Sequence, residues 1–181
     1  MANLLRATVI AVLFTGGCSG VRVTTDYDPS VDLWAFKTYA WATPKRQPTG
    51  DPRLDNPLLE ARIERAIEGA MHARDLRLVD DGNADFLVAY HVMVDQRRDV
   101  AEVPTAYGYR GFWGGFYGSR VYVDQYEVGT LMIDFLERES NRLVWRGSGE
   151  ARLHDRGSPE DRDLRAQRTV DAILKRFPPN R

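Results

Sequence analysis

Alternation of hydrophobic and polar residues predicts three β-strands in the middle and later parts of the chain. The pattern covers residues 86–94, 129–138 and 143–153. In the second of these segments Leu131, Ile133 and Phe135 share one face, while the residues between them share the other. Period-two alternation is typical of strands that bury one face and expose the other. The short connection at residues 139–142 predicts an antiparallel hairpin between the last two strands.

Two other segments repeat apolar residues at helical spacing and so predict two helices. The first can be capped by Asp or Asn at residues 55–56, carries Pro57 in its first turn and is expected to reach about Arg74. The second follows Ser158, which together with Asp161 is close to a capping box. Its apolar face consists of Ala166, Val170, Ile173, Leu174 and Phe177.

Two short β-rich segments, residues 21–27 and 37–41, precede the first helix. The resulting order β-β-α-β-β-β-α predicts an α+β fold, with a mainly antiparallel sheet and two helices packed on one face. Gly147 and Gly149 lie inside the last predicted strand. Glycine in a strand allows a helix to approach the sheet closely or marks a bulge, which is our interpretation of this pair.

The first 18 residues have the layout of an export signal. They contain one basic residue, Arg6, then an apolar stretch at residues 7–14, and end in small residues before Cys18. The apolar stretch is shorter than the roughly 20 residues that a membrane-spanning helix needs. Residues 15–18 resemble the lipobox of bacterial lipoproteins, although Thr15 stands where leucine is usual.

That resemblance implies that residues 1–17 are a cleaved lipoprotein signal peptide and that residues 18–181 form the mature domain. Cys18 would carry a diacylglyceryl group, and its new amine would be acylated, for example with palmitate. Two or more acyl chains anchor a protein stably to a membrane. Ser19 resembles the pattern for sorting to the periplasmic face of the outer membrane. An ordinary secreted protein and a buried N-terminal helix remain the alternatives.

Composition narrows the classes of chemistry that the domain can perform. The net charge of −1 and the pI near 6.3 give no electrostatic footprint for nucleic acid. Cys18 is the single cysteine, so its lipidation leaves no thiol for a disulfide, a zinc site or a nucleophile. The three histidines lack the spacing of a metal motif such as His-Glu-x-x-His. We therefore expect neither a cofactor nor a metal.

Asp134 and Arg146 are predicted to lie on the outer face of the sheet, on adjacent strands. They are interpreted either as a polar site or as a cross-strand ion pair worth a fraction of a kcal/mol. A hydrolase acting on an envelope polymer would need two carboxylates about 5–10 Å apart. Asp134 or Asp85 could act as its general acid or base, and this function stays open as an alternative.

A segment dense in glycine and aromatic residues predicts a flexible loop at about residues 99–120. It is interpreted as a linker between strands or as a contact surface, since aromatic side chains stack on sugars and are enriched at membrane interfaces. Its possible binding surface comprises Tyr107, Tyr109, Phe112, Trp113, Phe116 and Tyr117.

Seven segments, in order along the chain, resemble the domain of unknown function 4136 family of bacterial lipoproteins. They are residues 26–29, 37–41, 56–63, 85–91, 129–134, 143–147 and 177–179. The resemblance implies an envelope location and a fold but brings no catalytic residues. The sequence thus predicts a membrane-anchored, non-enzymatic binding or structural module for a protein, lipid or glycan. The hydrolase and a subunit of an envelope protein assembly are the alternatives.

Overall fold

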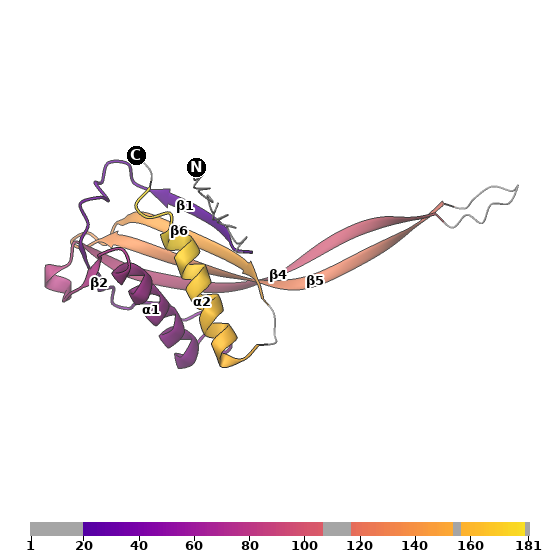
Figure 1. Ribbon diagram of the computed structural model, residues 1–181, viewed down its shortest axis with the longest axis horizontal. Coiled ribbons are helices and arrows are strands. Elements are labelled where there is room, and N and C mark those ends of the chain that lie inside the picture. Colours follow the sequence, from indigo (N-terminus) through magenta and orange to yellow (C-terminus); the bar gives the residue numbers. More distant parts are fainter. Residues whose placement is uncertain (1–19, 107–116, 154–156, 180–181) are drawn as a thin grey trace, which may run out of the picture.

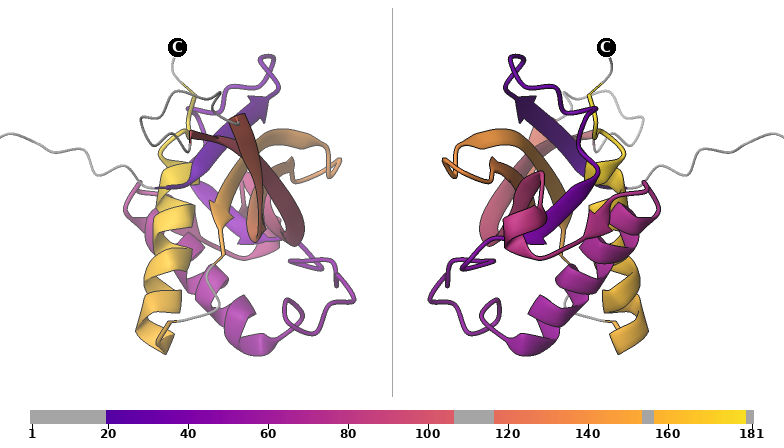
Figure 2. Two further views of the ribbon diagram at one scale, coloured as in Figure 1. Left: turned by 90° about the vertical axis from the view of Figure 1, so that its right-hand side faces the viewer. Right: turned by 90° about the vertical axis from the view of Figure 1, so that its left-hand side faces the viewer.

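Six strands form one mixed β-sheet, and two helices cover one of its faces (Figures 1 and 2). The computed structural model describes residues 20–106, 117–153 and 157–179. The strands are β1 (Arg22–Tyr27), β2 (Thr38–Trp41), β3 (Arg77–Leu78), β4 (Phe86–Ala106), β5 (Tyr117–Glu137) and β6 (Leu143–Arg152). The helices are α1 (Pro57–His72) and α2 (Pro159–Leu174).

The sheet has the strand order β1-β6-β5-β4-β2-β3. Strands β1, β6, β5 and β4 are antiparallel to one another in that order, whereas β2 is parallel to both β4 and β3. The α+β class and the two helices on one face are therefore confirmed. The sheet is mixed rather than mainly antiparallel, because α1 returns the chain to the same end of the sheet before β3 and β4 begin.

Both helices start where their capping residues predict. The side chain of Asn56 accepts the N–H of Leu59 at 3.0 Å, and Ser158 and Asp161 form a complete capping box. The helices end earlier than the apolar spacing suggests, α1 at His72 and α2 at Leu174. Phe177 is still a core residue, with 6% of its surface exposed, because a turn directs it back under the sheet.

The core lies between the sheet and the helices and is centred on aromatic rings. Phe135 packs against Phe86, Trp145 and Phe177 with ring centroids 4.6, 4.6 and 4.7 Å apart. Gly147 lets α2 approach β6, since a Cβ at this position would lie 2.4 Å from Cγ2 of Ile173. The prediction that glycine in this strand permits close helix packing is thereby confirmed.

Strands β4 and β5 continue as a two-stranded hairpin beyond the rest of the sheet (Figure 1). Pairing of β6 with β5 stops at Val128, but β4 and β5 remain paired as far as Ala106 and Tyr117. The loop predicted at about residues 99–120 was thus too long, since residues 99–106 and 117–120 are strand. Pro104 lies in a stretch where each hairpin strand pairs with a single described neighbour, the kind of position at which proline is found in sheets. Tyr117 begins β5, and Tyr107, Tyr109, Phe112, Trp113 and Phe116 lie outside the described residues.

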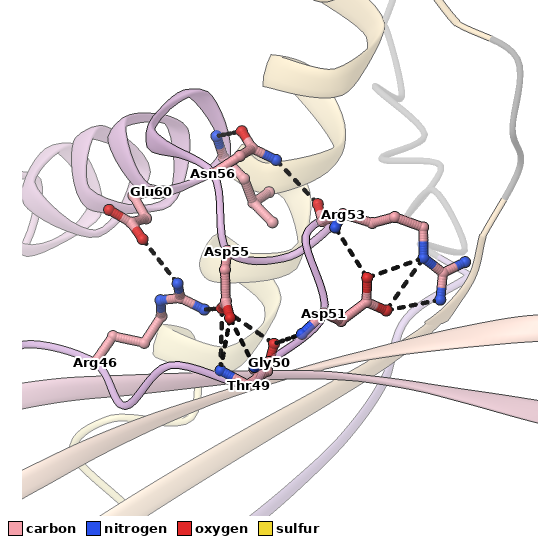
Figure 3. Close-up of polar contacts among 9 residues, drawn as sticks. Arg46, Thr49, Gly50, Asp51, Arg53, Asp55, Asn56 and Glu60 are labelled. Carbon is pink, nitrogen blue, oxygen red and sulfur yellow. Dashed lines mark hydrogen bonds and ion pairs between the residues drawn. The ribbon is translucent and has the colours of Figure 1, made fainter.

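The loop before α1 is tied to the helix by Arg46 and Asp55 (Figure 3). Asp55 accepts the N–H groups of Thr49 at 3.0 Å and Gly50 at 2.7 Å, and its Oδ1 lies 2.9 Å from Nη1 of Arg46. The other guanidinium nitrogen, Nη2, donates to Glu60 at 2.7 Å. The N–H of Thr49 lowers the pKa of Asp55 to about 2, and the N–H of Gly50, the hydroxyl of Thr49 and the guanidinium of Arg46 contribute to the same shift.

Acid should therefore weaken the domain partly through Asp55. Its pKa is about 2 in the folded chain and about 3.9 when unfolded, so the carboxylate stabilises the fold above about pH 4. That contribution is lost as the pH falls from about 4 to about 2. We expect urea midpoints of Asp55→Asn to fall less steeply over this range than those of the wild type. Asp171→Asn, at an exposed position on α2, is the control, and a slope for Asp55→Asn equal to the control's would contradict the prediction.

Candidate functional site

An open pocket of about 890 Å³ lies at the end of the sheet from which the β4–β5 hairpin projects. It is bounded by β4, β5 and β6 and by the N-terminal halves of the two helices. Its apolar floor is formed by Leu54, Leu59, Ile63, Val92, Leu131 and Leu153. Pockets that hold small ligands commonly measure roughly 300–1,000 Å³ and are largely apolar. The size and lining of this pocket therefore suit an apolar ligand or an apolar part of one.

The pocket stays open because small residues line it where the sheet faces α2. Gly149 and Ala151 on β6 and Ala166 on α2 present little or no side chain to this space. A larger residue at Gly149 would also meet α2, since its Cβ would lie 2.9 Å from Cδ1 of Ile173. Small residues on β6 therefore let α2 pack closely on the sheet near its C-terminal end, and they leave the pocket open beside its N-terminal half.

Five arginines line the same pocket. Arg152 forms an ion pair with Asp124, and the other four, which we call the arginine rim, are Arg62, Arg162, Arg165 and Arg168. Arg62 is largely buried and its Nε donates to Asp163 at 2.6 Å. Within residues 20–106, 117–153 and 157–179, no carboxylate forms an ion pair with Arg162, Arg165 or Arg168. Guanidinium groups bind phosphate and carboxylate through paired hydrogen bonds. The arginine rim is accordingly suited to an anionic group at an apolar pocket.

Asp134 and Arg146 come together on the opposite, outer face of the sheet. Nε and Nη2 of Arg146 donate to the two carboxylate oxygens of Asp134 at 2.6 and 2.5 Å. Asp134 is 3% exposed, and Nε2 of His91 lies 3.3 Å from its Oδ2. The hydrogen bonds to Asp134 raise the pKa of Arg146. The pair predicted from alternation therefore exists, with a carboxylate more deeply buried than a surface ion pair requires.

Asp85 holds the start of β2 rather than facing Asp134. Its Oδ2 accepts the N–H groups of Lys37 and Thr38, each at 2.8 Å. Partial burial opposes ionisation, but these hydrogen bonds outweigh it and lower the pKa of Asp85. In the sheet Asp134 is paired with Ala89, four residues along β4 from Asp85, which corresponds to about 13 Å of strand. The two carboxylates do not form the facing pair that the hydrolase alternative requires.

Sequence reasoning found the outer-face pair but missed the pocket and its arginine rim. The signal that could have indicated the rim is the spacing of Arg162, Arg165 and Arg168, which lie three residues apart and so share one side of α2. The pocket itself is bounded by apolar residues from five separate segments of the chain, so no local sequence pattern could predict it. In the described part of the chain no three His, Cys, Asp or Glu side chains are grouped so as to hold a metal. Neither described helix has the length and hydropathy needed to cross a membrane.

Comparison with known proteins gives a family and a fold. The profile of the family described as "Domain of unknown function (DUF4136)" matches residues 23–179. A crystal structure of a DUF4136 family protein from Bacteroides thetaiotaomicron is similar, with a TM-score of 0.52 and 16% identity, over 88% of this chain and 97% of that one. A comparison with curated protein sequences finds no match.

Two further solved structures are similar at lower TM-scores. The PelC dodecamer from Paraburkholderia phytofirmans has a TM-score of 0.48 and 12% identity, over 85% of this chain and 94% of that one. A PDZ domain protein from Parabacteroides distasonis has a TM-score of 0.48 and 17% identity, over 90% of this chain. The chain spans only 36% of the length of that protein.

Proposed function

The chain belongs to the DUF4136 family, and from this premise we propose that it is a lipid-anchored envelope module that binds an apolar ligand without transforming it. The proposed anchor is Cys18, acylated at the periplasmic face of the outer membrane. The proposed binding site is the pocket at the end of the sheet. Binding rather than catalysis is favoured because the candidate acids Asp134 and Asp85 are both held in contacts that stabilise the sheet.

One observation carries the proposal: the pocket lies beside the start of the described chain. Gly20 and Val21 are part of its lining, and Cys18 precedes Gly20 by two residues. Two residues span at most about 7 Å. An acylated Cys18 would therefore keep the pocket within a short distance of the membrane surface, where apolar ligands are concentrated.

Replacing Cys18 by alanine should leave an uncut precursor without acyl chains, because the thiol is the group that receives the diacylglyceryl unit. Intact-mass spectrometry of the purified chain measures both events. Ser19→Ala is the matched control and should be cut and acylated as in the wild type. Ser19→Asp should be acylated but kept from the outer membrane, which fractionation would reveal. Acylation of the Cys18→Ala chain would contradict the proposed anchor.

A second candidate function, a subunit of an envelope assembly, is favoured by the β4–β5 hairpin. Among the described residues, β4 from Asp95 to Ala106 and β5 from Tyr117 to Tyr126 pair only with each other. An isolated two-stranded hairpin is marginally stable in water, and its unpaired edges can accept a further strand. These edges suit a contact with another copy of the chain.

A shortened hairpin tests the assembly function. Joining Gln96 to Glu127 through an Asn-Gly turn removes the projecting part but keeps the facing pair at its base. If the hairpin joins copies of the chain, the wild type should be oligomeric by light scattering and the shortened chain monomeric, with unchanged circular dichroism of the body. A monomeric wild type, or oligomers that survive the deletion, would count against this function.

A further inference from the structure

We propose that the pocket binds a membrane phospholipid with an anionic headgroup, such as phosphatidylglycerol. An acyl chain would lie on the apolar floor, and the headgroup phosphate would contact the arginine rim. The inference deepens the proposed function and rests on it for the position of the pocket at the membrane. Two independent features of the pocket, its floor and its rim, indicate this class of ligand.

The floor selects the hydrocarbon part of the ligand. Its aliphatic side chains come from the loop before α1, from α1, from β4 and β5 and from the residue after β6, so an inserted chain would be surrounded on several sides. Burial of aliphatic carbon stabilises binding in proportion to the apolar area removed from water. An elongated ligand made of repeated CH₂ groups fits these aliphatic side chains better than a sugar, whose hydroxyls would face them.

The rim selects the headgroup. Arg162 and Arg168 are exposed and Arg165 is half-buried, and no described carboxylate forms an ion pair with them. The same helix also carries Glu160, Asp161 and Asp163, but Asp161 is engaged in the capping box and Asp163 pairs with Arg62. A zwitterionic headgroup would bring a cationic amine to the same arginines. The three arginines that lack a described carboxylate partner therefore favour a lipid whose phosphate is its only charge.

The start of the chain indicates the source of the lipid. Because Gly20 lines the pocket and Cys18 is at most about 7 Å of chain away, the anchor and the pocket would meet the same leaflet. A lipid of that leaflet could enter the pocket with its tail while its headgroup stays at the surface. We therefore commit to a bilayer phospholipid rather than a free phosphate ester.

Photochemical labelling tests the inference on the full chain purified from membranes. The protein is reconstituted in phosphatidylcholine vesicles that contain phosphatidylglycerol with a diazirine on one acyl chain, and in matched vesicles with diazirine-bearing phosphatidylcholine. After irradiation, mass spectrometry locates the adducts. We expect adducts of the phosphatidylglycerol probe on peptides that contain Leu59, Leu131 and Leu153, and about tenfold fewer with the phosphatidylcholine probe.

Two variants separate the rim and the floor from general effects on folding. Arg162→Gln with Arg165→Gln should reduce pocket adducts about tenfold, because two charge-assisted contacts are lost. Lys175→Gln with Arg176→Gln removes the same charge from the far end of α2 and should label as the wild type. Ala166→Trp should block the pocket and abolish adducts there, and its thermal unfolding checks that the chain is folded.

Equal labelling by both probes, unchanged labelling of the Arg162/Arg165 variant, or no adducts in the pocket would overturn the inference. Intact mass of the same sample reports whether Cys18 is acylated. Acylated protein with an unlabelled pocket would leave the proposed anchor standing and remove the lipid site. Protein without acyl chains whose pocket still prefers phosphatidylglycerol would remove the anchor and support the lipid site.

Discussion

Replacing Gly147 by alanine should destabilise the domain by about 3 kcal/mol, at the upper end of the cost of overpacking a core. The new Cβ would lie 2.4 Å from Cγ2 of Ile173 and 2.4 Å from Cη2 of Trp145. Both neighbours are fully buried, and neither contact can be relieved by moving the free end of a flexible chain. Relief requires α2 to move away from β6, which would open the aromatic core. Urea denaturation of the wild type and the variant measures the effect.

Gly69 provides a matched control for this substitution. It lies in α1 and is exposed, and a Cβ added to it would meet no atom within 4 Å. Alanine there should stabilise the domain by about 0.5–1 kcal/mol, because it raises helix propensity and restricts the unfolded chain. The same chemical change should thus have opposite signs at the two positions. A Gly147→Ala chain as stable as the wild type would contradict the close packing of α2 on β6.

Local features of the sequence were sufficient for the helix starts and for the faces of the strands. Asn56 and Ser158 act within one turn of their own helices, so their roles do not depend on the rest of the fold. Alternation placed Asp134 and Arg146 on one face because side-chain direction in a strand is fixed by sequence position. These predictions needed no knowledge of which elements become neighbours.

Features that depend on distant pairing were not predictable from the sequence. The parallel pairing of β2 with β4 depends on where α1 delivers the chain, and the length of the hairpin depends on a register set across β4 and β5. Residues 99–106 and 117–120 were predicted to be loop because they adjoin a segment rich in glycine and aromatic residues. The pocket was missed for the same reason, since its floor joins Leu54, Val92 and Leu153 from distant parts of the chain.

Replacing Arg146 by glutamine should cost about 2 kcal/mol of stability, far more than an exposed ion pair contributes. The substitution removes two short hydrogen bonds from a carboxylate that is 3% exposed. Among the described ion-pair partners of Asp134, it leaves His91 alone, at 3.3 Å. The full cost of orphaning a buried charge, about 3–5 kcal/mol, is not expected because Arg146 is itself 40% exposed and water can reach the vacated side.

The comparison with Arg97 separates burial from charge. Arg97 donates to Glu150 at 3.0 Å on the same sheet, but both side chains are substantially exposed, so Arg97→Gln should cost no more than about 0.5 kcal/mol. The double variant Asp134→Asn with Arg146→Gln should lose only about 1 kcal/mol, because no buried charge is then left unpaired. Equal losses for Arg97→Gln and Arg146→Gln would show that burial of Asp134 has no energetic weight.

The same variant distinguishes a structural pair from a catalytic one. If Asp134 and Arg146 stabilise the sheet, Arg146→Gln should lower the urea midpoint while lipid labelling in the pocket, on the other face, stays as in the wild type. If Asp134 instead acted as a general acid on an envelope polymer, the double variant Asp134→Asn with Arg146→Gln would be more stable than Arg146→Gln alone. It would nevertheless have lost activity towards that polymer. Because a carboxylate held by two donors and nearly excluded from water is poorly placed to exchange protons with a substrate, we expect the first result.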